Sequence, residues 1–173
     1  MQPTERIDAA IAIVARDGKV LVCQRKDDDD LGGYWEFPGG KCEAGETLEQ
    51  CLARELDEEL AIRARPVVRL ATVEHDYPHA LIRLHPFVCA HEHGEVEHRE
   101  CQASRWIDPQ SLRDYRFPPA NETLIEEAIA YFLTEIARID ESKEPKQPAI
   151  DLSPATETST IPPPSGDSLA AGD

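Results

Sequence analysis

Hydrophobic and polar positions along the first 140 residues follow two different periods. Apolar runs of strand length, several of them alternating, occupy residues 7–15, 19–25, 34–37, 67–76, 81–90 and 104–107. Asp17-Gly18 lies between the first two runs and is typical of a hairpin turn. We therefore expect a sheet of several strands in which the first two form a hairpin and residues 77–79 form a later turn.

Two segments carry a helical period instead. Residues 46–60 place four leucines at i, i+4 spacing, and residues 120–138 repeat apolar side chains at similar intervals. Pro118 and Pro119 precede the second segment, where proline can open a helix. Several strands with two unevenly placed helices predict α+β layers around a mixed sheet, and not a doubly wound repeat.

The composition changes near residue 140. Residues 141–173 contain six of the 14 prolines and none of the ten aromatic residues. A segment with so little apolar surface cannot offset the entropy lost when it becomes ordered. We expect residues 1–140 to form one domain and residues 141–173 to be a disordered, acidic tail rich in Pro, Ser and Thr.

Cysteine usage and the N-terminus bear on the compartment. The five cysteines are odd in number, widely spaced and without a C-x-x-C pair, which favours free thiols in a reducing environment. The first residues lack the pattern of a secretory signal. No apolar run approaches the roughly 20 residues that a bilayer span needs. The sequence therefore predicts a cytoplasmic protein without a membrane partner.

The formal net charge of −16 argues against a broad basic face, and so against direct binding of duplex DNA. Residues 40–62 hold seven acids and two bases, a net −5. On the predicted helix, Glu55, Glu58 and Glu59 share one side, and at least two of them lie at the edge of the leucine stripe. Like charges packed there are destabilising unless a cation such as Mg²⁺ neutralises them and bridges to phosphate. An acidic helix balanced by Arg54 would be the simpler interpretation if the helix stood alone.

Glycines and charges flank that helix in a recognisable order. The segment Gly40–Ile62 resembles the Nudix box, G-x5-E-x7-R-E-U-x-E-E-x-G-U, in which U is apolar. The matching positions are Gly40, Glu46, Arg54, Glu55, Leu56, Glu58, Glu59 and Ile62. Ala61 replaces the glycine that ends the helix, and alanine fits there unless a positive φ is needed.

The resemblance extends outside the box. Residues 14–25, the WEFPGGK at 35–41 and the FPPANE at 117–122 are similar to the MutT-type branch, which comprises 8-oxo-dGTP diphosphatases and CTP diphosphatase relatives. It covers roughly residues 7–135. The family implies a Nudix α/β/α sandwich with a mixed sheet between helices.

The resemblance also implies metal-binding and catalytic roles. The residues that match metal ligands, for Mg²⁺ or else Mn²⁺, are Glu55, Glu58, Glu59 and the carbonyl of Gly39. Glu46 and Arg54 match the pair that orients the helix. Either Glu55 or Glu100 would act as general base, and the sequence does not decide between them.

Further matches imply contacts to the nucleotide. These residues are Arg25, Phe37, Tyr77 and Asn121. Asn121 matches the residue that reads a purine edge, because an amide donates and accepts at once. The alternative is that Asn121 only caps the last helix, since asparagine is a preferred cap.

The activity implied is hydrolysis of a nucleoside triphosphate to the monophosphate and pyrophosphate. The leading substrate is 8-oxo-dGTP, whose removal sanitises the nucleotide pool for DNA replication and repair. The alternative substrate is CTP or a modified pyrimidine nucleotide. A non-catalytic nucleotide-sensing or protein-binding module is the competing class. A monomer and a homodimer both remain open.

Overall fold

The computed structural model describes residues 5–76, 78 and 80–143, with side chains described as far as residue 135. Tyr77 and His79 of the predicted turn lie outside the described residues. Residues 144–173 of the tail predicted from residue 141 also lie outside them, whereas residues 141–143 belong to a helix. The last helix continues to Lys143.

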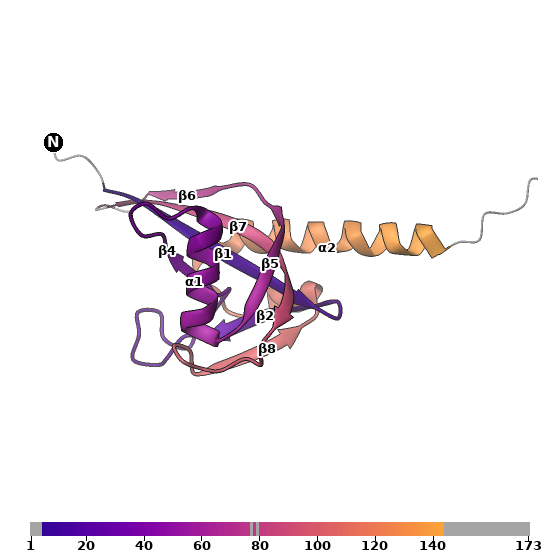
Figure 1. Cartoon of the computed structure of the whole chain (residues 1–173), viewed down its shortest axis with the longest axis horizontal. Helices are drawn as coiled ribbons and strands as arrows, with labels where there is room; N and C mark the ends of the chain where they lie inside the picture. Colours follow the sequence, from indigo (N-terminus) through magenta and orange to yellow (C-terminus); the bar gives the residue numbers. More distant parts are fainter. Residues whose placement is uncertain (1–4, 77, 79, 144–173) are drawn as a thin grey trace, which may run out of the picture.

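One mixed sheet of eight strands forms the centre of the described chain (Figure 1). The strands are β1 Glu5–Arg16, β2 Lys19–Gln24, β3 Trp35–Glu36, β4 Gly39–Lys41, β5 Arg63–Arg69, β6 Val73–Asp76, β7 Ala80–His93 and β8 Ala103–Ile107. The long strands β1 and β7 run parallel, whereas the other pairings are antiparallel. The predicted hairpin is confirmed: Asp17 and Gly18 both have positive φ, as a type I′ turn requires.

The prediction of one strand over residues 67–76 is wrong. The structure has two strands there, and β5 begins earlier, at Arg63. Arg69 lies opposite Phe87 and Val73 opposite Leu84, so three residues of the outer chain face only two of β7. One of those two is Pro86, which has no N–H to continue the ladder.

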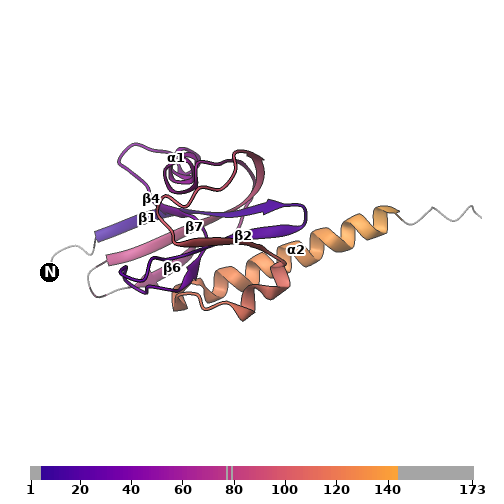
Figure 2. The ribbon, with the colours of Figure 1, turned by 90° about the horizontal axis from the view of Figure 1, so that it is seen from below.

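The helices cover opposite faces of the sheet (Figure 2). Helix α1 spans Leu48–Leu60 and α2 spans Glu122–Lys143, preceded by short 3₁₀ turns at Pro109–Asp114 and Pro119–Asn121. α1 begins two residues later than predicted because Thr47 and Gln50 form a reciprocal capping box. None of the helices in the described part of the chain combines the length and apolar character needed to cross a bilayer.

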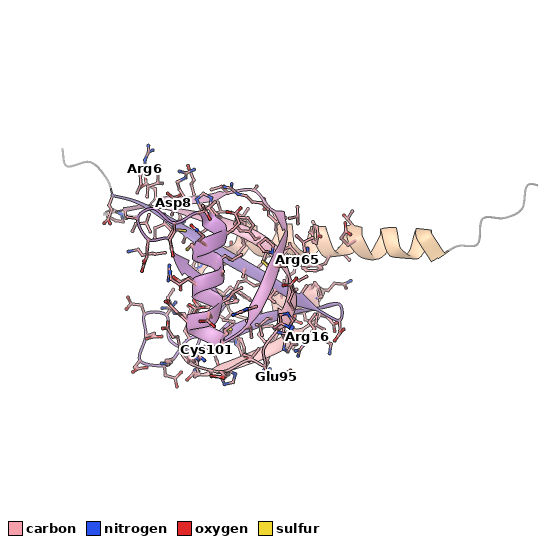
Figure 3. The ribbon with its side chains drawn as sticks, in the orientation of Figure 1. Arg6, Asp8, Arg16, Arg65, Glu95 and Cys101 are labelled. Atoms are coloured by element: carbon pink, nitrogen blue, oxygen red, sulfur yellow. The ribbon has the colours of Figure 1, made fainter. Side chains whose placement is uncertain are left out.

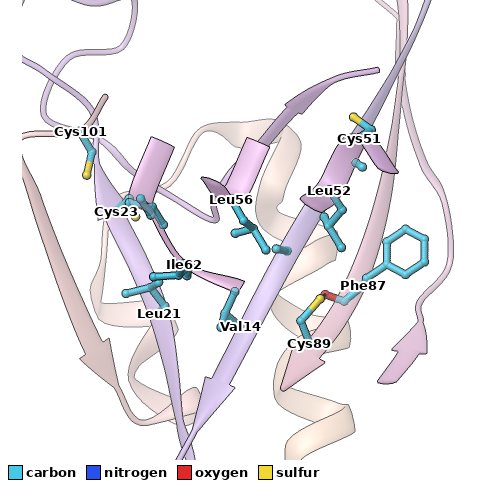
Figure 4. Close-up of a cluster of buried hydrophobic side chains, with 13 residues drawn as sticks. Val14, Leu21, Cys23, Cys51, Leu52, Leu56, Ile62, Phe87, Cys89 and Cys101 are labelled. Atoms are coloured by element: carbon cyan, nitrogen blue, oxygen red, sulfur yellow. Dashed lines mark hydrogen bonds between the residues drawn. The ribbon is translucent and has the colours of Figure 1, made fainter. Parts of the chain in front are cut away.

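Each face of the sheet carries its own apolar core. The leucine stripe of α1 packs on side chains from β1, β2 and β7, including Val14, Leu21 and Phe87 (Figure 4). The other cluster packs Leu124, Ile125, Ala128 and Ile129 of α2 against Ile13, Val20 and Val22. The two cores fix α1 and the loops around it relative to the sheet, and the candidate site lies at that junction.

Candidate active site

Arg54 joins the loop before α1 to the acidic side of the helix. Its Nε and Nη2 donate to the two carboxylate oxygens of Glu46 at 2.7 and 3.1 Å. Its Nη1 donates to Glu55 at 2.9 Å and to Glu58 at 3.1 Å, and Nη2 also donates to the Lys41 carbonyl at 3.0 Å. The hydrogen bonds from Arg54 lower the pKa of Glu46 to about 2. The guanidinium therefore fixes the loop and two acidic side chains against one another.

Two consecutive glycines let the β4 backbone approach its neighbours closely. A Cβ on Gly39, whose φ is 137°, would lie 2.2 Å from the Ala10 carbonyl oxygen. A Cβ on Gly40 would lie 2.5 Å from the carboxyl carbon of Glu55. The Gly39 N–H donates to Glu59 at 3.1 Å. The glycine pair thus places Glu55 and Glu59 directly against the backbone of β4.

Glu59 is a mostly buried carboxyl in an acidic environment. Its pKa is raised to about 8, mainly by burial and further by the nearby charges of Glu55, Glu36 and Glu100, while the hydrogen bond from Gly39 opposes the rise. A buried carboxylate next to other acids is costly without a compensating cation. Glu59 can therefore be ionised near neutral pH only if a cation compensates its charge, and no basic side chain is among the groups that shift its pKa.

A pocket of about 160 Å³ opens beside the C-terminal end of α1. Its polar lining includes Arg25, Glu36, Glu59 and Glu100. Cys101 lies next to that end of the helix (Figure 3). The structure thus brings three of the predicted site residues to one pocket: Arg25 directly after β2, Glu59 of α1 and Glu100 in the loop before β8.

The oxygen donors of this region suit a hard divalent cation. Among the side chains that the structure describes, no group of three His, Cys, Asp or Glu already converges on one point. Mg²⁺ needs only one or two direct carboxylates and keeps several waters. Glu59 with Glu55 beside it, and Glu58 one turn from Glu55, therefore fits such an ion, whose charge would favour the ionised form of Glu59. The Gly39 carbonyl as a further ligand stays a prediction.

Phe37 and Asn121, two of the predicted contacts to the nucleotide, do not line this pocket. Phe37 is 4% exposed and packs against Phe117 in the α2 core, with ring centroids 5.3 Å apart. Asn121 ends the 3₁₀ turn before α2, and its side-chain amide bonds no residue in the described part of the chain. The hydrogen bond expected of a helix cap is therefore missing. Tyr77 lies outside the described residues.

The sequence prediction did not include Glu36, Asp29 or the thiols of Cys23 and Cys101, which also line the pocket. Glu36 lies directly opposite Cys23 in the β2–β3 ladder. Trp35 and Phe37 pack into the α2 core, so alternation along the strand sends Glu36 to the other face. That alternation was the available signal for Glu36.

The NUDIX domain family matches residues 9–127 of the chain. This range contains the loop, the helix and the pocket described above. The chain belongs to the Nudix family. The family resemblance is therefore confirmed, and the chain is an enzyme, a Nudix hydrolase. Nudix hydrolases act on nucleotide substrates and generally use a divalent metal.

Two similar proteins are named after different nucleotide substrates. The CTP pyrophosphohydrolase of Escherichia coli (strain K12) is 38% identical over 72% of this Nudix chain and 92% of that protein. The 8-oxo-dGTP diphosphatase of Haemophilus influenzae is 37% identical over 69% and 88%. Because the two sequence identities are almost equal, they do not favour either substrate, and the choice between them depends on the residues of this chain.

Solved structures have the same fold. The E. coli ORF135 protein has a TM-score of 0.68 and 36% identity, with 78% of this chain and 94% of that one covered. MutT from Aliivibrio salmonicida and Vibrio cholerae has a TM-score of 0.60 and 33% identity, over 73% and 99%. The predicted α+β fold, with a mixed sheet between helices, is confirmed.

Ala61 is where this Nudix chain departs from the family pattern. It follows α1 with φ 57° and ψ 29°, the left-handed conformation, and its N–H donates to the Asp57 carbonyl at 3.0 Å. The positive φ that favours glycine is therefore present, and the chain adopts it with alanine.

Proposed function

We propose that this Nudix hydrolase cleaves a nucleoside 5′-triphosphate to the monophosphate and pyrophosphate with Mg²⁺, or alternatively Mn²⁺. The observation that carries the proposal is the mostly buried Glu59 carboxyl, which lines one pocket with Glu36 and Glu100 and also lies close enough to Glu55 to be affected by its charge. Such a site favours a cation, and a cation-bridged polyphosphate is the anion that an acidic pocket can accept. The net charge of −16 leads us to expect no binding of duplex DNA.

Metal-binding residues would be Glu55, Glu58 and Glu59, with the Gly39 carbonyl. A bound divalent ion neutralises phosphate oxygens and lowers the pKa of a coordinated water. Arg54 and Glu46 hold the helix and loop in register, so that the carboxylates keep their positions when a substrate enters. These two residues are therefore structural supports for the reaction.

We assign the general base to Glu100. Its carboxylate lines the pocket and has no ion-pair partner among the described residues, whereas Glu55 accepts a hydrogen bond from Arg54 at 2.9 Å. An unpaired carboxylate can take a proton from the attacking water more readily than one engaged with a guanidinium. Glu55 remains the alternative base. Glu100→Gln should reduce kcat with little change in KM.

The favoured substrate is 8-oxo-dGTP, because the Asn121 amide neither donates to nor accepts from any residue that the structure describes and can therefore do both with a base edge. This activity would remove damaged nucleotides before replication. The second candidate is CTP or a modified pyrimidine nucleotide, favoured by the 38% identity to a CTP pyrophosphohydrolase. Cytoplasmic location and a monomeric or dimeric state are parts of the same proposal.

A nucleotide panel with pyrophosphate readout tests these alternatives. It compares 8-oxo-dGTP, dGTP, CTP and 5-methyl-dCTP at matched Mg²⁺. The proposal expects the highest kcat/KM for 8-oxo-dGTP and loss of that preference in Asn121→Ala. Equal turnover of 8-oxo-dGTP and dGTP would exclude the favoured substrate, and a preference for CTP would support the second. No hydrolysis of any nucleotide with Mg²⁺ or Mn²⁺ would leave a non-catalytic binding module.

A further inference from the structure

Arg25 is held by two contacts at the edge of the pocket. Its Nη1 donates to Glu36 at 2.8 Å and its Nε donates to the Asp30 carbonyl at 2.7 Å. A guanidinium has five N–H donors, so three of them have no partner among the described residues. Two fixed contacts define the plane of the guanidinium and leave its remaining donors for a ligand.

The sheet register explains why Glu36 meets Arg25. Glu36 lies opposite Cys23 in the antiparallel β2–β3 ladder, and the Arg25 N–H continues that ladder to the Tyr34 carbonyl at 2.9 Å. Residues two apart on a strand share a face. Arg25 and Glu36 are therefore diagonal neighbours on the face that carries the catalytic helix.

Glu36 is an unusual residue for this position. Burial raises its pKa, and the hydrogen bond from Arg25 opposes that rise. A partly buried carboxylate is retained only where a partner compensates its desolvation. The same pocket contains Glu59 and Glu100, which would otherwise attract Arg25. An arginine paired with either of them would occupy the carboxylates that the reaction needs.

We infer that Glu36 is a positioning residue that holds Arg25 in the orientation in which its guanidinium receives the nucleotide. The inference rests on the proposed function. Glu36 acts through Arg25 and keeps this cation away from Glu59 and Glu100. The nucleotide then meets, in a fixed plane, the three N–H donors that bond no other described residue, and this arrangement suits the oxygens of a phosphate chain or of a base carbonyl.

A double-mutant cycle tests this role with the best nucleotide of the panel. The variants are Glu36→Gln, Arg25→Gln and the double change, with kcat and KM measured separately. Each single change should raise KM about 10-fold, the usual effect of losing one hydrogen bond to a charged group, and change kcat less than threefold. The double variant should equal Arg25→Gln alone. Glu36→Asp, which retains the charge, should recover part of the loss.

A matched control is the exposed pair of Arg113 and Glu126, joined at 2.9 and 2.5 Å. Glu126→Gln removes a similar ion pair and should leave KM unchanged. The thermal midpoint of every variant is also measured. If Glu36 had only a structural role, Glu36→Gln would lower the thermal midpoint, and the effects of Glu36→Gln and Arg25→Gln on KM would be additive.

The outcomes separate the two proposals. An active wild type with additive effects of Glu36→Gln and Arg25→Gln would overturn the positioning role alone. An effect of Glu36→Gln confined to kcat would also overturn it. A wild type that hydrolyses no nucleotide would overturn the proposed function, and this role with it.

Discussion

The substitution Glu59→Gln should have two effects: it should stabilise the metal-free protein, and it should abolish nucleotide hydrolysis. The folded-state pKa of Glu59 is raised to about 8 from the model-compound value of 4.5. Between these two values the folded protein holds a proton that the unfolded chain has lost, so the stability of the wild type falls as the pH rises. The full shift corresponds to a loss on the order of 5 kcal/mol. Glutamine at position 59 carries no charge and avoids this loss.

Urea unfolding in EDTA at pH 5 and pH 8 measures the effect. The free energy of unfolding of Glu59→Gln minus that of the wild type should increase across this interval and be clearly positive at pH 8. Glu58→Gln is the control, because the Glu58 side chain is 54% exposed on the same helix. Added Mg²⁺ should stabilise the wild type more than Glu59→Gln. A difference that stays constant between pH 5 and pH 8 would refute the reasoning that burial and neighbouring acids strain this carboxyl.

Three other changes have distinct expected results. Ala61→Gly should raise the free energy of unfolding by about 0.5–1 kcal/mol by relieving the left-handed alanine, whereas Ala53→Gly within the same helix should lower it by about 1 kcal/mol; urea unfolding of both distinguishes the conformations. Gly40→Ala should displace the flexible Glu55 carboxylate and reduce kcat/KM about 100-fold, with little change in the thermal midpoint, and unchanged activity would contradict the predicted contact. The pKa of Asp8 is lowered from 3.8 by its hydrogen bond to the buried histidine of β7, so Asp8→Asn should destabilise the protein at pH 7 and progressively less as the pH falls below 3.8, as unfolding measured over this pH range would show.

Local patterns were sufficient for much of the fold. The leucine spacing of residues 48–60 and the Asp17-Gly18 turn each act within a few residues, so their elements could be predicted. The break between β5 and β6 could not, because it depends on Pro86 lying opposite residues 70–72 across the sheet. Thr47 and Gln50 form the capping box that makes α1 begin at Leu48. Both residues were visible in the sequence, but the helical pattern starts at Glu46 and therefore favoured an earlier start.

The candidate site divides in the same way. The box spacing alone singled out Glu55, Glu58 and Glu59 as one acidic group, because helix geometry is local. Their differing environments depend on the tertiary structure. The approach of Gly39 and Gly40 buries most of the Glu59 carboxylate, whereas the Glu58 carboxylate stays in solvent.

The sequence by itself determined the family, the α+β layers and the acidic helix, because spacing along one chain specifies which side chains share a face. Only the tertiary structure decided what those side chains meet. Packing of β4 on β1 sets the backbone against Glu59, and the β2–β3 register sets Glu36 beside Arg25. Desolvation and charge pairing depend on distances between segments far apart in sequence, and these distances exist only after the sheet has formed.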